Sequence, residues 1–404
     1  MLDFTLYKLY ILYMEKVSLV KCGSYNQEEV NQKVLEAINL LGGLESFIKK
    51  GQHVALKVNL LMKATPEKAM TTHPAVVFAV AKLVKEFGAT PFIVDSAGGP
   101  FTQGYINSIY SASGLKEVAE NLEIELNQDF SHEQAQNPNA VVGFKFPICT
   151  AIEKADVIIN LSKLKTHSFT GYTNAIKNMF GIIPGLTKVE MHGKYRDLDT
   201  FMDFLLDIHT YLGDKLVLNI TDAVIGMEGF GPSNGTPKFI GAILASKSAI
   251  HSDIVATQII GLTPEFTPTI KKAIQRGLVS ETLETEVVGE KLEDMVLKDF
   301  KTIEPNNFKP YANYVPKFLQ NTVHKVMTKR PVISPRKCKG CQKCFNHCPV
   351  KAISMETKKD GHKFAKIDYN KCIRCYCCQE LCPFGIVKVK AGFIYKLVHL
   401  RDKK

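Results

Sequence analysis

The chain has 404 residues, of which 45% are hydrophobic and 23% charged, and its formal net charge is +11. This length predicts two or three domains, and the composition is typical of a globular protein rather than of a disordered chain. No apolar run approaches the roughly 20 residues that a membrane-spanning helix needs, so the sequence predicts no membrane span.

The first thirteen residues are apolar, but they lack the basic start and the small-residue cleavage site of a secretory signal. Met14 opens a more ordinary beginning. We therefore expect residues 1–13 to be an N-terminal extension, either a strand or a stretch that is not part of the natural chain. Because no other feature indicates export, we expect a cytoplasmic protein.

Residues 14–301 alternate between strand and helix patterns. This alternation predicts an α/β body with a mostly parallel sheet and helices on both faces. Strands are predicted at 53–61, 90–96, 122–126, 156–162, 215–224 and 238–246. Helices are predicted at 27–41, 74–88, 114–122, 173–181, 198–213 and 248–262.

A cationic motif directly follows the strand predicted at 156–162. It contains Lys163, Lys165 and His167 and leads into the short helix predicted at 173–181. Parallel α/β proteins bind ligands where a strand ends in a loop before a helix, and lysines with free helix N–H groups favour an anion there. The body contains no G-x-G-x-x-G after a strand and no G-x-x-x-x-G-K-[ST], so dinucleotide or nucleoside-triphosphate binding of those kinds has no support.

Residues 302–330 are predicted to be a linker. Pro305, Pro310 and Pro316 interrupt regular structure, and one helix is expected around residues 318–329. The linker separates the body from a cysteine-rich segment at 331–404, where we expect a small α+β domain.

Nine of the eleven cysteines lie between Cys338 and Cys382. Such crowding without a signal peptide indicates metal binding rather than disulfides. Two runs have the spacing C-x₂-C-x₂-C-x₃-C-P, in which the fourth cysteine of each run ligates the cluster of the other run. The sequence therefore predicts two [4Fe-4S] clusters, one held by Cys338, Cys341, Cys344 and Cys382, and one by Cys372, Cys375, Cys378 and Cys348.

The alternatives for these cysteines are zinc sites and disulfides. Zinc typically uses paired C-x-x-C knuckles rather than two four-cysteine runs that both end in proline. Cys377 is extra to the spacing, and we expect it to be a small buried thiol that ligates no iron. The segment resembles the two-cluster ferredoxin family, including Ala352-Ile353 after the first run, and this resemblance implies one-electron transfer.

The positive charge is concentrated in this same segment. Residues 331–404 contain 17 Lys and Arg against 5 Asp and Glu, whereas the rest of the chain contains 34 against 35. Basic clusters occur in nucleic-acid-binding proteins, but cations also offset the negative charge of iron–sulfur clusters and attract acidic redox partners. Because few aromatic residues interleave with the basic ones, we favour the redox interpretation over nucleic-acid binding.

The body resembles the uncharacterised family named domain of unknown function 362. The resemblance covers roughly residues 14–300 and implies an architecture without an established activity. One departure is SKSAIHSDIVAT, where Ser248 stands in place of an aspartate and Asp253 is kept. The segments that carry the resemblance are LKVNLL, TTHPAVVFAVAKLVKEFGA, VDSAGG, LKTHSFTGYTNAIKNMFG and DAVIGMEGFGPSNG.

Candidate residues in the body follow these motifs. As catalytic residues we predict Lys163, Lys165 and His167, with His167 as a proton donor because histidine titrates near neutrality. Each candidate has a structural alternative, such as ending a strand or capping a helix, and Lys177 is expected to be solvated. The predicted substrate-pocket residues are Lys57, Asn59, His73 and Asn178. Further positions that could bind a metal, phosphate or substrate are Asp95, Asp222, Glu228 and the loop 229–235.

Three functions remain open. The first is an iron–sulfur oxidoreductase that exchanges electrons with a soluble, acidic partner protein and reduces a small anionic substrate. The second is a non-catalytic electron carrier or assembly factor whose body docks a partner protein. The third is a nucleic-acid-binding protein that uses the basic tail.

Overall fold

The computed structural model describes residues 14–263, 267–305, 316 and 328–391. The extension predicted at 1–13 lies outside the described residues, and so does nearly all of the helix predicted around 318–329. None of the helices in the described ranges combines the length and the apolarity that a bilayer crossing requires.

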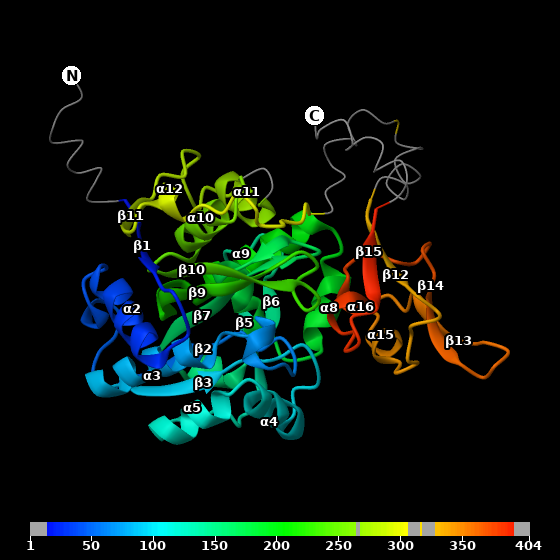
Figure 1. The fold of residues 1–404 in the computed structure, drawn as a ribbon, viewed down its shortest axis with the longest axis horizontal. Helices are drawn as coiled ribbons and strands as arrows, with labels where there is room; N and C mark the ends of the chain where they lie inside the picture. Colours follow the sequence, from blue (N-terminus) through cyan, green and yellow to red (C-terminus); the bar gives the residue numbers. More distant parts are fainter. Residues whose placement is uncertain (1–13, 264–266, 306–315, 317–327, 392–404) are drawn as a thin grey trace.

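One nine-stranded sheet forms the centre of the described body (Figure 1). Its strands are β1 (Lys16–Lys21), β2 (His53–Lys57), β3 (Thr90–Val94), β4 (Glu125–Leu126), β7 (Val157–His167), β8 (Gly171–Thr173), β9 (Leu216–Glu228), β10 (Thr236–Ser246) and β11 (Glu286–Gly289). Their order is β11-β1-β10-β9-β7-β2-β3-β4, with β8 paired to β7. Neighbours are parallel except for the pairs of β10 with β1 and β9 and the pair of β7 with β8. The predicted, mostly parallel α/β fold is confirmed.

Helices cover this sheet, and a separate hairpin of β5 (His132–Gln136) and β6 (Lys145–Cys149) lies outside it. Several helices begin and end where the sequence predicts. Asn26 accepts hydrogen bonds from two backbone N–H groups at the start of the first helix, and Gly88, with φ of 95°, ends the second. The helices are α2 (Gln27–Asn39), α3 (Pro74–Phe87), α4 (Gln103–Ala112), α5 (Leu115–Leu122), α6 (Thr150–Lys154), α7 (Ala175–Asn178), α8 (Thr187–Lys194), α9 (Leu198–Leu212), α10 (Ala249–Ile259), α11 (Pro268–Gln275) and α12 (Leu292–Met295).

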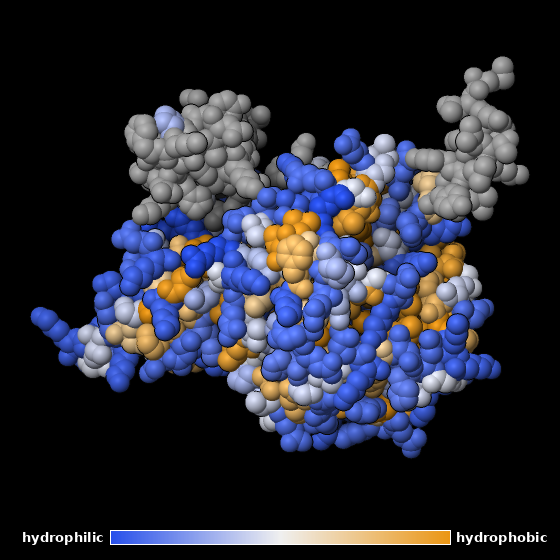
Figure 2. Space-filling view, turned by 180° about the vertical axis from the view of Figure 1, so that it is seen from behind, coloured by the Kyte–Doolittle hydropathy of each residue, from blue (hydrophilic) through white to orange (hydrophobic). Residues whose placement is uncertain are grey.

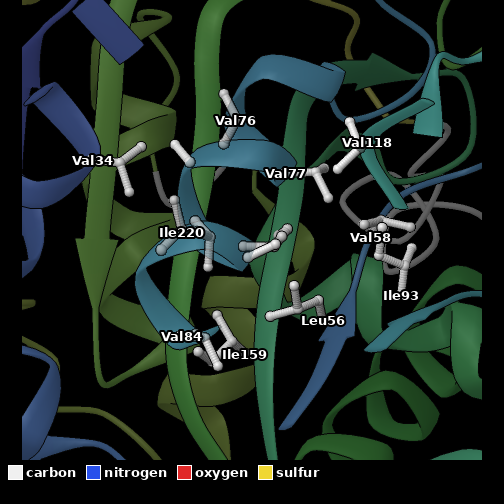
Figure 3. Close-up of a cluster of buried hydrophobic side chains, with 14 of the residues drawn as sticks. Val34, Leu56, Val58, Val76, Val77, Val84, Ile93, Val118, Ile159 and Ile220 are labelled. Carbon is white, nitrogen blue, oxygen red and sulfur yellow. The ribbon is translucent and has the colours of Figure 1, made fainter. Parts of the chain in front are cut away.

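Alternate residues of the central strands enter different hydrophobic clusters. Leu56 and Ile159 belong to the cluster beneath α2, α3 and α5, where the valines of α3 lie above the strands (Figure 3). Their neighbours Ala55 and Ile158 belong to the cluster that includes α7, α9 and α11. Because successive side chains of a strand point to opposite faces, these strands are buried on both sides, which is why they read as continuous apolar runs.

The cationic motif is not the loop that the sequence predicts. β7 continues from Val157 to His167, and β8 turns back to pair with its last residues. Lys165 pairs with Thr173 on one side and with Met227 of β9 on the other. The neighbouring strands satisfy the backbone polar groups of this segment, so it remains extended, and its side chains have the alternation of a strand.

The cysteine-rich segment forms a small α+β unit beside the body, with α16 next to α8 (Figure 1). This α+β class is the one predicted. Seen from behind, the molecule is covered mostly by hydrophilic residues, and apolar residues form separate patches between them (Figure 2). The elements of the segment are β12 (Arg330–Ile333) paired with β15 (Val387–Lys390), β13 (Ile353–Thr357) paired with β14 (Lys363–Ile367), and the helices α15 (Lys343–Asn346) and α16 (Cys377–Glu380).

The two cysteine runs repeat in the backbone as well as in the sequence. Gln342 and Tyr376 occupy the same place in the two runs, and both have φ of 63°. Lys351 and Gly385 also correspond, with φ of 50° and 59°. Each of the first two residues immediately precedes its short helix, so α15 and α16 are equivalent elements of an internal repeat.

Candidate functional site

A candidate site is a cavity of about 720 Å³ between the body and α16, which we call the shared cavity. The body lines it with the ends of β7, with α7 and with α8, and the cysteine-rich segment lines it with α16 and Leu381. The polar and charged residues at its wall are Asn59, Asp95, Ser96, Lys165, His167, Thr173, Lys177, Asn178, Lys188, His192 and Glu380. Of the predicted site residues, Lys165, His167, Asn59 and Asn178 therefore meet at this cavity.

Lys165 is buried in a network of neutral oxygens. Its ammonium donates to Asn59 Oδ1 at 2.6 Å and to the Met70 carbonyl at 2.6 Å. Asn59 in turn donates through Nδ2 to Asn178 Oδ1 at 3.0 Å. Burial lowers the pKa of Lys165 to about 7, and the nearby charges of Lys163 and Lys177 contribute to the lowering. Lys165 can thus release or accept a proton near neutral pH.

Lys177 is partly buried at the cavity wall, in contrast to the expected solvated side chain. Its ammonium lies 4.4 Å from the centre of the Phe180 ring, and it makes no hydrogen bond or ion pair within the described part of the chain. Burial lowers its pKa to about 8. The nearby Glu380 carboxylate opposes this lowering but forms no ion pair with Lys177. A partly buried ammonium that forms no ion pair favours a ligand that brings a negative charge.

His167 is held as a neutral imidazole. The backbone N–H groups of Phe169 and Thr170 donate to its Nδ1 at 3.1 and 3.4 Å. Nδ1 is therefore an acceptor, and the ring proton resides on Nε2, which lies 3.3 Å from Glu380 Oε1. Burial lowers the pKa of His167 well below its ordinary value, and nearby Lys177 lowers it further. We expected His167 to titrate near neutral pH. Its environment instead favours the neutral form there, because burial disfavours the charged imidazolium.

The remaining predicted residues do not line the shared cavity. Lys163 is buried and pairs with Asp222 at 2.8 Å, and it also donates to Tyr25 Oη at 2.7 Å. His73 stacks on Tyr25 with ring centres 3.5 Å apart and accepts from the Ala75 N–H at the start of α3. These contacts join the starts of α2 and α3 to the central strands.

Lys57 and Asp95 form a second buried ion pair, with 2.9 Å between Nζ and Oδ1. Asp95 lies at the cavity wall and Lys57 lies behind it. Glu228, another candidate, instead accepts from the Lys301 N–H at 2.9 Å. Of the three acidic candidates, only Asp95 lines the cavity, whereas Asp222 and Glu228 bind other groups away from it.

The loop at 229–235 connects β9 to β10 and contacts α16. Gln379 donates through Nε2 to the Phe230 carbonyl, and Asn234 donates to the Gln379 carbonyl, both at 3.0 Å. At Gly231 an added Cβ would collide with the Thr166 carbonyl oxygen, so only glycine fits against β7. This loop holds the cysteine-rich segment against the body.

The cysteine-rich segment contains two smaller cavities, each lined by four cysteines. None of these cysteines is in a disulfide. The first cavity, of about 340 Å³, is lined by Cys338, Cys341, Cys344 and Cys382, and the second, of about 320 Å³, is lined by Cys348, Cys372, Cys375 and Cys378.

The arrangement of the four cysteines around each cavity distinguishes a site for a single metal ion from a site for a cluster. Among the described residues, no three His, Cys, Asp or Glu side chains converge closely enough to hold one ion. Zinc binds sulfur at about 2.3 Å and would draw four thiolates tightly together. Four cysteines spaced around a hollow fit a cube of iron and sulfide better than one zinc ion.

Two family models match separate parts of the chain. The family described as domain of unknown function (DUF362) matches residues 54–258, about half of the chain. The chain belongs to the DUF362 family. A 4Fe-4S dicluster domain matches residues 337–386, so the chain also carries an iron–sulfur domain of the ferredoxin type.

Individual relatives resemble either most of the chain or a shorter part of it. A thylakoid-associated protein of Synechocystis sp. is 29% identical over 310 residues, which cover 76% of this chain and 94% of that protein. Pyruvate synthase subunit PorD of Methanocaldococcus jannaschii is 38% identical over 64 residues, which cover 16% of this chain and 70% of that subunit. A lactate racemase apoprotein from Thermoanaerobacterium thermosaccharolyticum aligns with a TM-score of 0.37 and 14% identity, over 60% of this chain and 57% of that one.

Three residues of the shared cavity escape prediction from the sequence. Lys188 in α8 of the DUF362 body donates to Ser96 and to the Ile183 carbonyl. His192, four residues later, is buried, and its Nδ1 has no hydrogen-bond partner among the described residues. Glu380 lies between the cysteines of the second run. Of the three, only Glu380 could have been noticed in the sequence, because it is an acidic residue in a basic segment and lies between cysteines that are expected to hold a cluster.

Proposed function

We propose that this DUF362 chain is an iron–sulfur redox protein that passes low-potential electrons through two [4Fe-4S] clusters to a small anion in the shared cavity. The match to a dicluster domain and the two four-cysteine cavities support the electron-transfer part of this proposal. One cluster would be held by Cys338, Cys341, Cys344 and Cys382, and the other by Cys372, Cys375, Cys378 and Cys348. When bound, the clusters supply and accept single electrons.

The shared cavity is the observation that carries the proposal. One wall is α16, which contains Cys378 and places Cys377 and Glu380 at the cavity. The opposite wall is cationic and belongs to the body. An acceptor bound there would lie within a few residues of the second set of cysteines. The location therefore joins the redox segment to a pocket that the body forms.

The charge of the wall supports an anionic acceptor. Lys177 forms no ion pair among the described residues, although the Glu380 carboxylate is near enough to raise its pKa, whereas Asp95 is already paired with Lys57. A carboxylate or oxyanion would satisfy the Lys177 ammonium. His192 also lines the cavity, and its buried Nδ1 has no hydrogen-bond partner in the described part of the chain.

We assign proton delivery to Lys165 rather than to His167. At neutral pH, Lys165 exchanges its proton readily because its pKa is near 7. His167 instead stays a neutral imidazole, whose Nε2 lies 3.3 Å from Glu380 Oε1. Lys163, which does not reach the cavity, holds the strand ends in place through Asp222.

Replacing Lys177 tests the anion site. The K177M variant should bind small oxyanions and carboxylates about ten- to a hundredfold more weakly, because a charged hydrogen bond contributes about 1.5–3 kcal/mol. Calorimetry under anaerobic conditions with sulfate, phosphate, oxalate and pyruvate measures this affinity. K145M is the matched control, since Lys145 is exposed on β6 and does not line the cavity. Equal affinities of K177M and K145M, or no binding of any of these anions, would contradict the proposed site.

Anion affinity should also depend on pH. Lys165 and Lys177 are cationic below their pKa values of about 7 and about 8 and neutral above them. Their charged neighbours are Lys57, Lys163, Lys188, Asp95 and Glu380, and burial also lowers the pKa of Lys188 to about 7. Sulfate, whose charge is constant in this range, should therefore bind about tenfold or more weakly at pH 9 than at pH 7. Calorimetric titrations across this range check the slope, and a flat profile would rule out a requirement for lysine protonation.

A further inference from the structure

The two equivalent helices of the cysteine repeat have different surroundings. α16 is packed against the body, where Gln379 and Glu380 contact the 229–235 loop and His167. α15 has no such cover from the described part of the body, and Lys343, Phe345 and Asn346 are exposed on it. Of the two equivalent helices, α16 therefore forms an interface with the body, whereas α15 is exposed on the described surface.

The open side has its own composition. Phe345 is 41% exposed and Phe384 is 51% exposed, and Phe384 lines the cavity of Cys338, Cys341, Cys344 and Cys382. Cys341 is itself exposed. An exposed cysteine of a cluster site, at the same cavity as the exposed Phe384, provides a short route for an electron into this cavity from outside. We call this surface the α15 face.

Basic residues dominate the α15 face. Between residues 334 and 355 the sequence has five Lys and Arg and no Asp or Glu. Lys339 and Lys343 line the same cavity as Cys341. None of the five basic side chains forms an ion pair within the described residues, whereas Lys366 of the same segment pairs with Glu356. Unpaired cations around apolar residues match an acidic surface with an apolar centre.

We infer that the α15 face is the docking surface for an acidic electron-carrier protein, which exchanges electrons with the cluster of Cys338, Cys341, Cys344 and Cys382. This inference rests on the proposed function, since it needs the clusters. The cluster of Cys348, Cys372, Cys375 and Cys378 then stands between the entry point and the shared cavity. One electron passes in each encounter, from the reduced carrier to the oxidised cluster, and no bond forms or breaks.

Charge reversal on the α15 face tests the inference. The K339E/K343E variant should be reduced by an acidic flavodoxin, in its fully reduced form, at least about tenfold more slowly than the unmodified chain at low salt. The difference should shrink as ionic strength rises. Anaerobic stopped-flow absorbance of the clusters gives the second-order rate constant. The matched control is K359E/K390E, which makes the same charge change in the β13–β14 turn and at the end of β15.

A small reductant separates this inference from the function on which it rests. Titanium(III) citrate needs no docking surface and should reduce both variants as fast as the unmodified chain. Equal slowing of K339E/K343E and K359E/K390E by flavodoxin, or no slowing of either, would overturn the α15 face as the entry site. If titanium(III) citrate reduces no cluster in the unmodified chain, the inference falls together with the proposed function.

Discussion

The double variant C348A/C372A should keep about four irons per chain, half of the about eight expected for two [4Fe-4S] clusters. Cys348 belongs to the first run and Cys372 to the second, but both line one cavity. If the fourth cysteines cross between the runs, both substitutions remove ligands from the same cluster, and the other cluster is left with four cysteines. Iron analysis and EPR of the reduced, anaerobically purified protein measure the outcome.

Two further variants complete this experiment. C338A/C348A removes one cysteine from each cavity and should lose nearly all iron, and part of the fold of the segment with it, because cluster binding contributes folding free energy. C377A should keep all the iron, since Cys377 lines the shared cavity and neither of the four-cysteine cavities. Loss of all iron in C348A/C372A with four irons left in C338A/C348A would mean that the ligands do not cross.

Replacing Lys163 by methionine should destabilise the body by about 3–5 kcal/mol, because it leaves the buried Asp222 carboxylate without its cation. Lys163 and Asp222 are both almost completely buried, with 2.8 Å between Nζ and Oδ2. The Tyr25 hydroxyl and the His73 N–H also donate to Asp222, but neither is charged. Urea unfolding of the body, followed by circular dichroism, measures the loss of stability.

The control is the K163M/D222N double variant. The carboxamide that D222N introduces would keep one oxygen for the Tyr25 hydroxyl but carry no charge, so the double variant should be more stable than K163M alone. Anion binding in the shared cavity should survive in both, because Lys163 does not line it. If the K163M protein is as stable as the unmodified chain but no longer binds anions, Lys163 acts directly in anion binding at the shared cavity, and this prediction is wrong.

Much of the architecture can be predicted from local patterns. Largely apolar runs predicted β2, β3, β7, β9 and β10, because strands buried on both faces are rich in apolar residues. Caps such as Asn26 and Gly88 predicted where helices begin and end. The cysteine spacing predicted which four side chains surround each hollow, since a close series of cysteines dictates a tight loop whatever packs around it.

The shared cavity could not be predicted in the same way. The sequence placed Lys163, Lys165 and His167 together in one loop, but the strand continues through them, and contacts with β8 and β9 decide which way each side chain points. Lys163 therefore pairs with Asp222, while Lys165 and His167 reach the cavity. An ion pair between residues that lie far apart in the chain, such as Lys163 and Asp222, cannot be predicted from their positions in the sequence.

Local patterns in the sequence predicted the ferredoxin-type segment, the two sets of four cysteines expected to hold its clusters, and an α/β body of the DUF362 family, because periodicity and spacing are local properties of the chain. Tertiary structure alone decided that Lys177 and Glu380 line one cavity and that α16 is covered while α15 is open. The physical reason is that burial and charge pairing depend on which surfaces meet, and residues about 200 positions apart meet here only after folding.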